Sequence, residues 1–282
     1  MPTVDIPQGR IEYRVAGPEQ SPAPPVVFVH GLLVDGEIWA RVADMLAARG
    51  IRSYAPDLPL GSHRIPWADG TDLGPRGVAR LVIEFMTALD LTEVTLVGND
   101  TGGALCQFLV DTDHSRVGRL LLTNCDAFDQ FPPAPFDRIV KVGRRPAALL
   151  AMMTSVRPKA VRHSMLGYGG LVRDPLDPAM TERWITPILN DPAIRRDTAR
   201  FLRQVDPNDL VDVGGRLGRF PKPVRLVWGM ADRFFKPEMG QRLRDAFTDA
   251  TLAEVTDGRT FLPLDEPARV ADEIATFAGS RT

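Results

Sequence analysis

Short apolar runs alternate with amphipathic stretches along the first 125 residues of the chain. The run Val26-Val27-Phe28-Val29 is rich in β-branched and aromatic side chains and ends just before a glycine, which predicts a buried strand. Apolar positions three and four residues apart predict an amphipathic helix over 75–89. By the same criteria we predict strands at 52–55, 94–97 and 120–123 and helices at 38–49 and 102–110. Strands that alternate with helices form a parallel sheet covered by helices on both faces.

This alternation stops after residue 125 and resumes near residue 219. The segment 126–218 contains helical patches and several prolines but no convincing strand, so we predict a helical cap inserted into the sheet domain. After the cap we predict strands at 224–228 and 251–255 and helices at 237–247 and 267–277. The predicted fold class is therefore α/β, with a core domain formed by residues 1–125 and 219–282 and a cap formed by residues 126–218.

The composition narrows the kinds of partner that the chain can have. Hydrophobic residues make up 44% of the 282 residues and charged residues 25%, which is ordinary for a globular protein that buries a full core. A net charge of −2 without a dense Lys/Arg stripe argues against nucleic acid or an anionic membrane as partner and favours a small molecule. Two cysteines cannot form a disulfide framework, and no apolar run is long enough to span a membrane. We therefore expect a cytoplasmic monomer or homodimer.

The strongest chemical motif lies where a predicted strand gives way to a helix. Asp100 stands there between two glycines, Gly98 and Gly102, each two residues away. Such a turn is so tight that the flanking positions tolerate little besides glycine, and it raises the central side chain above the sheet edge. The N-terminus of the following helix also favours negative charge. The alternative is an ordinary turn in which Asp100 caps the helix.

Here the chain resembles the nucleophile elbow of the α/β-hydrolase superfamily, and the resemblance extends over most of the sequence. With aspartate at the centre of the turn, it is similar to the haloalkane dehalogenases and epoxide hydrolases. The resemblance implies that Asp100 is a nucleophile, that no cofactor takes part, and that Asp232 is the acid of a catalytic triad. It also implies an oxyanion hole formed by the backbone N–H groups of Leu32 and Thr101. His30, just before that loop, is then best explained as a buried structural histidine.

The chain departs from this pattern at the place of the triad histidine, which Thr260 occupies. The four histidines of the sequence all lie elsewhere, at positions 30, 63, 114 and 163. An ester on an aspartyl nucleophile is broken only by an activated water, and a general base typically contributes about 10²- to 10⁴-fold to such a step. Three explanations stay open: a base supplied from elsewhere, a different reaction in which Asp100 is acid or base, or a site that has lost catalysis.

Several side chains are candidates for a substitute base or for substrate binding. His63 is the strongest, because its loop is expected to border the pocket, although a solvated or capping histidine is the alternative. His163 and Tyr168 of the cap could reach the same pocket. Arg259 could bind a substrate carboxylate or pair with Asp232. We therefore count as candidate substrate-binding residues His30, His63, Tyr168, Arg259 and Thr260.

Residues that set specificity in the similar enzymes are missing here. Those dehalogenases hold halide with a tryptophan after the nucleophile and a partner near the oxyanion loop, whereas this chain has Thr101 and Leu32. Epoxide hydrolases use two cap tyrosines, and Tyr168 is the only tyrosine of the predicted cap. The leading hypothesis is a hydrolase of a small apolar substrate. The alternatives are a lyase or isomerase that uses Asp100 as acid or base, and an inactive ligand-binding member.

Overall fold

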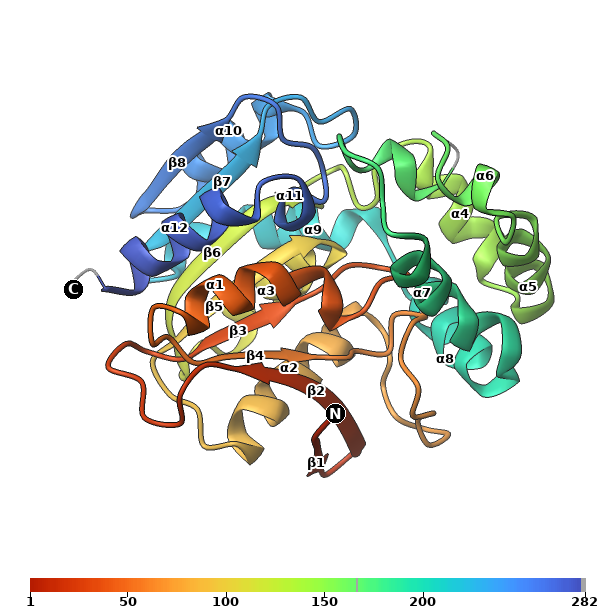
Figure 1. Cartoon of the computed structure of the whole chain (residues 1–282), viewed down its shortest axis with the longest axis horizontal. Coiled ribbons are helices and arrows are strands. Elements are labelled where there is room, and N and C mark those ends of the chain that lie inside the picture. The colour runs from red at the N-terminus through yellow and green to blue at the C-terminus, as the bar shows by residue number, and fades with distance from the viewer. Residues whose placement is uncertain (166, 280–282) are drawn as a thin grey trace.

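A sheet of eight strands forms the centre of the molecule in the computed structural model, which describes residues 1–165 and 167–279. Its strands lie in the order β1-β2-β4-β3-β5-β6-β7-β8 (Figure 1). β1 and β2 pair antiparallel with their neighbours, and all later strands are parallel. The strands are β1 (Thr3–Ile6), β2 (Gly9–Ala16), β3 (Val26–Val29), β4 (Ser53–Pro56), β5 (Val94–Asp100), β6 (Val117–Cys125), β7 (Val224–Gly229) and β8 (Ala250–Val255).

Helices cover both faces of this sheet, which confirms the predicted fold class. α1 packs against α12 on one face, and α2 packs against α3 on the other (Figure 1). The central strands β3, β5 and β6 are buried almost throughout, as the unbroken apolar run of β3 predicted. The core helices are η1 (Gly36–Trp39), α1 (Ala40–Ala47), α2 (Pro75–Ala88), α3 (Thr101–Thr112), α10 (Pro237–Ala246), α11 (Leu262–Asp265) and α12 (Pro267–Gly279).

The chain between β6 and β7 is helical and contains no named strand in its described part. Its elements are α4 (Phe136–Gly143), α5 (Pro146–Ser155), α6 (Lys159–Arg162), η2 (Tyr168–Gly170), α7 (Pro178–Asn190), α8 (Pro192–Arg203), α9 (Pro207–Gly214) and η3 (Leu217–Arg219). Figure 1 shows α4 to α8, coloured green to teal, gathered at one side of the molecule, whereas α9 lies against α3 of the core. We keep the name cap for this segment.

Aspartate-proline pairs begin three of the cap helices. Asp177, Asp191 and Asp206 each precede a proline and accept a hydrogen bond from the backbone N–H two residues further on. The aspartate satisfies one of the free N–H groups of the first turn, and proline at the first helical position lacks the N–H that would otherwise be unpaired. These pairs, which suggest only interruptions when read in the sequence, therefore mark helix starts.

The N-terminal hairpin is an addition that the sequence did not predict. β1 and β2 pair antiparallel with Thr3 opposite Glu12, and β2 then pairs with β4. Ile6 and Ile11 turn inward while most other side chains of the hairpin are partly or fully exposed. This weak alternation over short edge strands gives little signal in comparison with the apolar runs of the central strands.

A buried carboxylate fastens the cap to the core. Asp35, which lies in the loop after β3 and has no exposed surface, accepts hydrogen bonds from Arg183 and Trp184 of α7 at 3.2 and 3.0 Å. Arg64 of the core donates to the same carboxylate at 3.1 Å. Burial raises the pKa of Asp35, but the charge of Arg183 and these hydrogen bonds outweigh burial, so that the pKa lies below its usual value. Asp35 is therefore an ionised link between the cap and the core.

Candidate active site

Asp100 lies at the carboxyl end of β5 in the tight turn that leads into α3. Its φ of +55° is in the left-handed region, where a residue other than glycine is strained. A Cβ on Gly98 would lie 2.8 Å from the Sγ of Cys106, and a Cβ on Gly102 would lie 2.2 Å from the carbonyl oxygen of Val29. Both glycines are thus required because the backbone of the turn passes so close to its neighbours.

The backbone around Asp100 holds its carboxylate in one orientation. The Leu32 N–H donates to Oδ2 at 3.2 Å, and the Thr101 N–H also stabilises the ionised carboxylate. A Cβ on Gly31 would lie 2.1 Å from Oδ2, so the Leu32 N–H can approach only because position 31 is glycine. Burial raises the pKa of Asp100 to about 7; the two N–H groups oppose that rise and the charge of Asp232 adds to it. Asp100 therefore changes its ionisation near neutral pH.

A cavity of about 360 Å³ opens from Asp100 toward the cap. Its volume is in the range of small-molecule sites. Most of its lining is apolar and comes from cap helices as well as from the loops after β3 and β6. The apolar lining includes Leu33, Phe131, Ile139, Met153, Phe201 and Phe235. A small apolar molecule would therefore be desolvated in contact with Asp100.

A second carboxyl, that of Asp126, lines the same cavity, and the sequence analysis missed it. Asp126 comes directly after β6, whose last residue Cys125 is paired with Asp100 in the sheet. Only 1% of Asp126 is exposed, and neither carboxyl oxygen meets hydrogen-bond geometry with a described residue. Burial raises the pKa of Asp126 well above its usual value, the charge of Asp100 raises it further, and the Thr101 hydroxyl opposes this only in part. An acidic residue directly after a fully buried strand was the signal available in the sequence.

Asp232 and Thr260 lie together, near enough for the charge of Asp232 to act on Asp100, but neither residue lines the cavity. The Thr260 hydroxyl donates to Asp232 Oδ1 at 3.1 Å, and the backbone N–H groups of Phe234 and Phe235 donate to the same oxygen. Burial raises the pKa of Asp232 to about 6 against these hydrogen bonds. The Thr260 hydroxyl cannot accept a proton at neutral pH, so the base of this pair is the Asp232 carboxylate, which does not line the cavity.

His30 and His63 are both buried away from the cavity. His30 Nε2 accepts the Leu58 N–H at 2.8 Å, and burial lowers the pKa of His30 to about 4, so the ring is a neutral structural group. His63 was expected to border the pocket, and this is wrong: it does not line the cavity but faces Asp197 of α8, with Nε2 3.6 Å from Oδ2. The carboxylate that faces this ring belongs to a residue more than 100 positions away in the sequence, so the loop sequence around His63 gives no sign of the contact.

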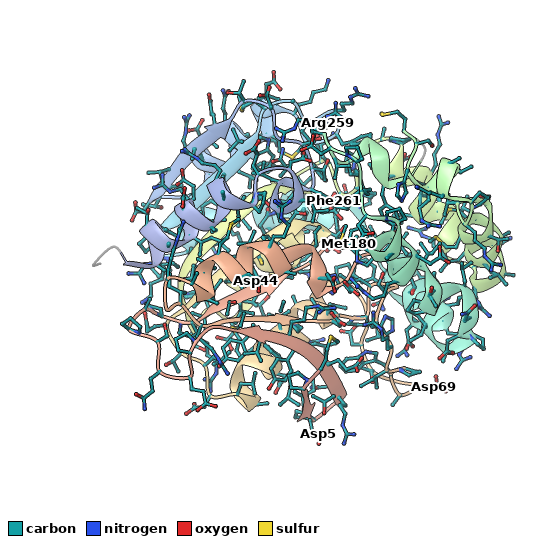
Figure 2. All side chains as sticks on the ribbon, viewed as in Figure 1. Asp5, Asp44, Asp69, Met180, Arg259 and Phe261 are labelled. Carbon is teal, nitrogen blue, oxygen red and sulfur yellow. The ribbon has the colours of Figure 1, made fainter. Side chains whose placement is uncertain are left out.

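Of the other candidates only Tyr168 reaches the cavity. Tyr168 lines it and donates its hydroxyl to the Leu33 carbonyl at 2.6 Å. His163 hydrogen-bonds the Thr181 hydroxyl instead and does not line the cavity. Arg259, labelled in Figure 2, donates to the Val172 carbonyl at 2.7 Å, which corrects the expectation that it binds substrate or pairs with Asp232.

The described residues bring together no group of three histidine, cysteine or acidic side chains that could hold a metal ion. In the same part of the chain, every helix is too short or too polar to cross a bilayer. Both cysteines, Cys106 and Cys125, are free and buried, and burial raises the pKa of each thiol. Two buried aspartates of raised pKa beside an apolar cavity are thus the chemically distinctive feature of the site.

Known proteins resemble this chain in both sequence and fold. A sequence model of the alpha/beta hydrolase family matches residues 26–273. Haloalkane dehalogenase 2 of Mycobacterium tuberculosis is 27% identical over 297 residues, covering 96% of this chain and 92% of the relative. A 2-hydroxy-6-oxononadienedioate/2-hydroxy-6-oxononatrienedioate hydrolase of Dechloromonas aromatica is 27% identical over 229 residues, covering 77% and 74%. An α/β hydrolase fold protein from Burkholderia ambifaria superposes with a TM-score of 0.77 at 26% identity, covering 95% of this chain and 94% of that one.

Proposed function

Because the chain belongs to the alpha/beta hydrolase family, we propose that it is a cofactor-independent hydrolase of a small apolar substrate and that Asp100 is its nucleophile. The observation that carries this proposal is the position of the Asp100 carboxylate. It lines an apolar cavity while one of its oxygens accepts the Leu32 N–H. That arrangement leaves Oδ1 as the oxygen that can attack a bound electrophile.

The reaction takes two steps. Asp100 Oδ1 attacks an electrophilic carbon of the substrate, and an ester forms between the substrate and the enzyme. Water then attacks Cγ of Asp100, and Oδ2 becomes the oxyanion of the tetrahedral intermediate. The Leu32 N–H already donates to this oxygen, and the Thr101 N–H stabilises the same carboxylate, so both are in place for the developing charge.

The cavity also limits the substrate class. The mycobacterial relatives are haloalkane dehalogenases, yet the described cavity lining includes no indole N–H that could hold a departing halide. Its polar side chains are Asp100, Thr101, Asp126, Ser155, Arg162 and Tyr168. Arg162 is already bound to the Thr181 hydroxyl and to Glu182. A substrate whose leaving atom is an oxygen suits this lining better than an alkyl halide does.

Proton-transfer chemistry is the second candidate function. A pKa near 7 suits a general base that must release its proton again at neutral pH, and burial gives Asp100 such a pKa. In that case Asp100 would take a proton from carbon, as in a lyase or isomerase, and no covalent intermediate would form. The two candidates therefore differ in whether Asp100 ever carries an ester.

The test is to measure the intact mass of the protein after incubation with 1-bromohexane and with 1,2-epoxyhexane. Attack by Asp100 is expected to add one hexyl or hydroxyhexyl group per chain, at least transiently, and Asp100→Asn should add none. Multiple turnovers in H₂¹⁸O should also place ¹⁸O in the Asp100 carboxyl, because water attacks Cγ. Product formation without any label in Asp100 would exclude the nucleophile and favour proton transfer.

A further inference from the structure

Asp126 is held in a fixed position relative to Asp100 by the backbone. Its carbonyl accepts a hydrogen bond from Gln107 of α3 at 2.8 Å, and Gln107 also donates to the Gly103 carbonyl. α3 begins directly after Asp100, and Cys125 pairs with Asp100 across the sheet. Asp100 and Asp126 thus line one cavity from the ends of neighbouring strands.

Apart from the Thr101 hydroxyl, which opposes the rise of its pKa only in part, no described residue stabilises the Asp126 carboxyl. A buried polar side chain is normally hydrogen-bonded, and leaving one without a partner is unfavourable. Both Asp126 oxygens lack a partner of hydrogen-bond geometry, in contrast to Asp35 and Asp232, each of which accepts several N–H donors. Asp126 lines the cavity beside Asp100, so a ligand bound there would be near enough to supply the partners that its buried carboxyl lacks.

We infer that Asp126 is a second catalytic residue, which protonates the departing oxygen of the substrate and then, as a carboxylate, activates the water that hydrolyses the Asp100 ester. The inference rests on the proposed nucleophile. One side chain is then first the acid and later the base. The missing histidine would have provided the base. Paired carboxylates of unequal pKa perform the same two roles in retaining glycoside hydrolysis.

The protons balance over the cycle with an epoxide as substrate. At rest Asp126 carries a proton and Asp100 is ionised, because two carboxyls in one dry cavity do not both ionise readily. Asp100 Oδ1 forms a bond to a ring carbon, the carbon–oxygen bond of the ring breaks, and the released oxygen takes the proton of Asp126. The products of this step are a hydroxyalkyl ester on Asp100 and an ionised Asp126.

In the second step the Asp126 carboxylate takes a proton from water as the water oxygen bonds to Asp100 Cγ. The intermediate collapses, the diol oxygen leaves with the proton from Asp126, and the remaining proton passes from the Asp100 carboxyl to Asp126. The net reaction is epoxide plus water to diol, with both side chains restored. Burial that holds a proton on Asp126 at rest also makes its carboxylate a stronger base.

An alkyl bromide breaks this cycle, because bromide leaves without a proton. Asp126 then stays protonated after Asp100 is alkylated, and the base needed for the second step is not generated. Wild-type protein should therefore turn over 1,2-epoxyhexane but accumulate a stable hexyl ester with 1-bromohexane. This comparison uses the unchanged chain, so it does not depend on the folding of any variant.

The experiment combines these two probes with Asp126→Asn and with the matched control Asp129→Asn, an exposed aspartate of the same loop. Asp126→Asn should lower epoxide turnover by about 10²- to 10⁴-fold, the usual contribution of general acid–base catalysis. It should still be alkylated by 1-bromohexane at a rate within a few-fold of wild type. Asp129→Asn should behave as wild type with both probes.

Two results would overturn the inference while leaving the proposed function intact. One is epoxide turnover by Asp126→Asn within threefold of wild type, with ¹⁸O still entering Asp100. The other is wild-type turnover of 1-bromohexane as fast as that of the epoxide. Failure of both probes to modify or be converted by wild-type protein would instead refute the nucleophile, and the inference with it.

Discussion

Replacing Asp100 by asparagine should make the protein more stable at alkaline pH. The pKa of Asp100 is raised from 3.8 to about 7 by burial, so the folded protein binds this proton more tightly than the unfolded chain does. For an acid with a raised pKa, the free energy of unfolding falls as pH rises from about 4 to about 7. Three pKa units correspond to about 4 kcal/mol of lost stability above that range.

Asparagine has the shape of aspartate and keeps an oxygen for the Leu32 N–H, but it cannot ionise. Part of the hydrogen-bonding capacity of its buried amide group has no partner, and we set the cost in stability at about 1 to 3 kcal/mol. The expected net gain for Asp100→Asn is therefore about 1 to 3 kcal/mol near pH 8, and it turns into a loss of up to about 2 kcal/mol near pH 4.5. Loss of activity and gain of stability in one substitution are typical of a buried catalytic group.

Urea denaturation at both pH values measures this difference as a shift of the midpoint at constant m value. Asp69→Asn, a change at an exposed residue labelled in Figure 2, is the control and should show no pH-dependent difference from wild type. A destabilised Asp100→Asn at pH 8, or a stability difference that is the same at both pH values, would refute the argument that Asp100 is ionised at a cost in the folded protein.

Three further predictions follow from contacts at the site and its surroundings. Gly31→Ala should lower the rate at which 1-bromohexane alkylates Asp100 by about 10²-fold or more, because the new Cβ would displace Oδ2; stopped intact-mass time courses measure this rate. Asp35→Asn should lower the free energy of unfolding by about 3 kcal/mol in urea titrations, because buried charge pairs between cap and core are broken. Thr260→His, if it folds with an unchanged m value, should give less than a tenfold gain in epoxide turnover, since Asp126 already provides the base; a larger gain would mean that the site lacks one.

Much of the core could be predicted because its strands are buried on both faces. The strand at 26–29 matches β3 residue for residue, and the helix predicted at 75–89 is α2 with an end one residue earlier. The edge hairpin was missed because its side chains are mostly exposed and its strands are short. Local patterns thus identify strands buried on both faces and helices with one clear apolar face, and give little signal for short edge strands that are mostly exposed.

The candidate site could be predicted only where chain-local geometry determines it. The glycines beside Asp100 are required by contacts within a few residues of the turn and by the adjacent strand, so the motif was visible in the sequence. The burial of His63 depends on Asp197 of the cap, and the exposure of Asp126 to the cavity depends on the pairing of β5 with β6. Neither long-range contact can be inferred from neighbouring residues, which is why one histidine was overvalued and one aspartate overlooked.

The hydrogen bond from Tyr168 to the Leu33 carbonyl connects the cap to the loop that lies against Asp100. Leu33 follows Leu32, whose N–H holds Asp100 Oδ2, and Leu33 itself has a φ of +59° and donates its N–H to Leu60. A displacement of Tyr168 would therefore either break this hydrogen bond or shift the loop that carries the Leu32 N–H. One hydrogen bond thus joins the cap to the loop that orients the Asp100 carboxylate, so the cap is a support of the site as well as a wall of its cavity.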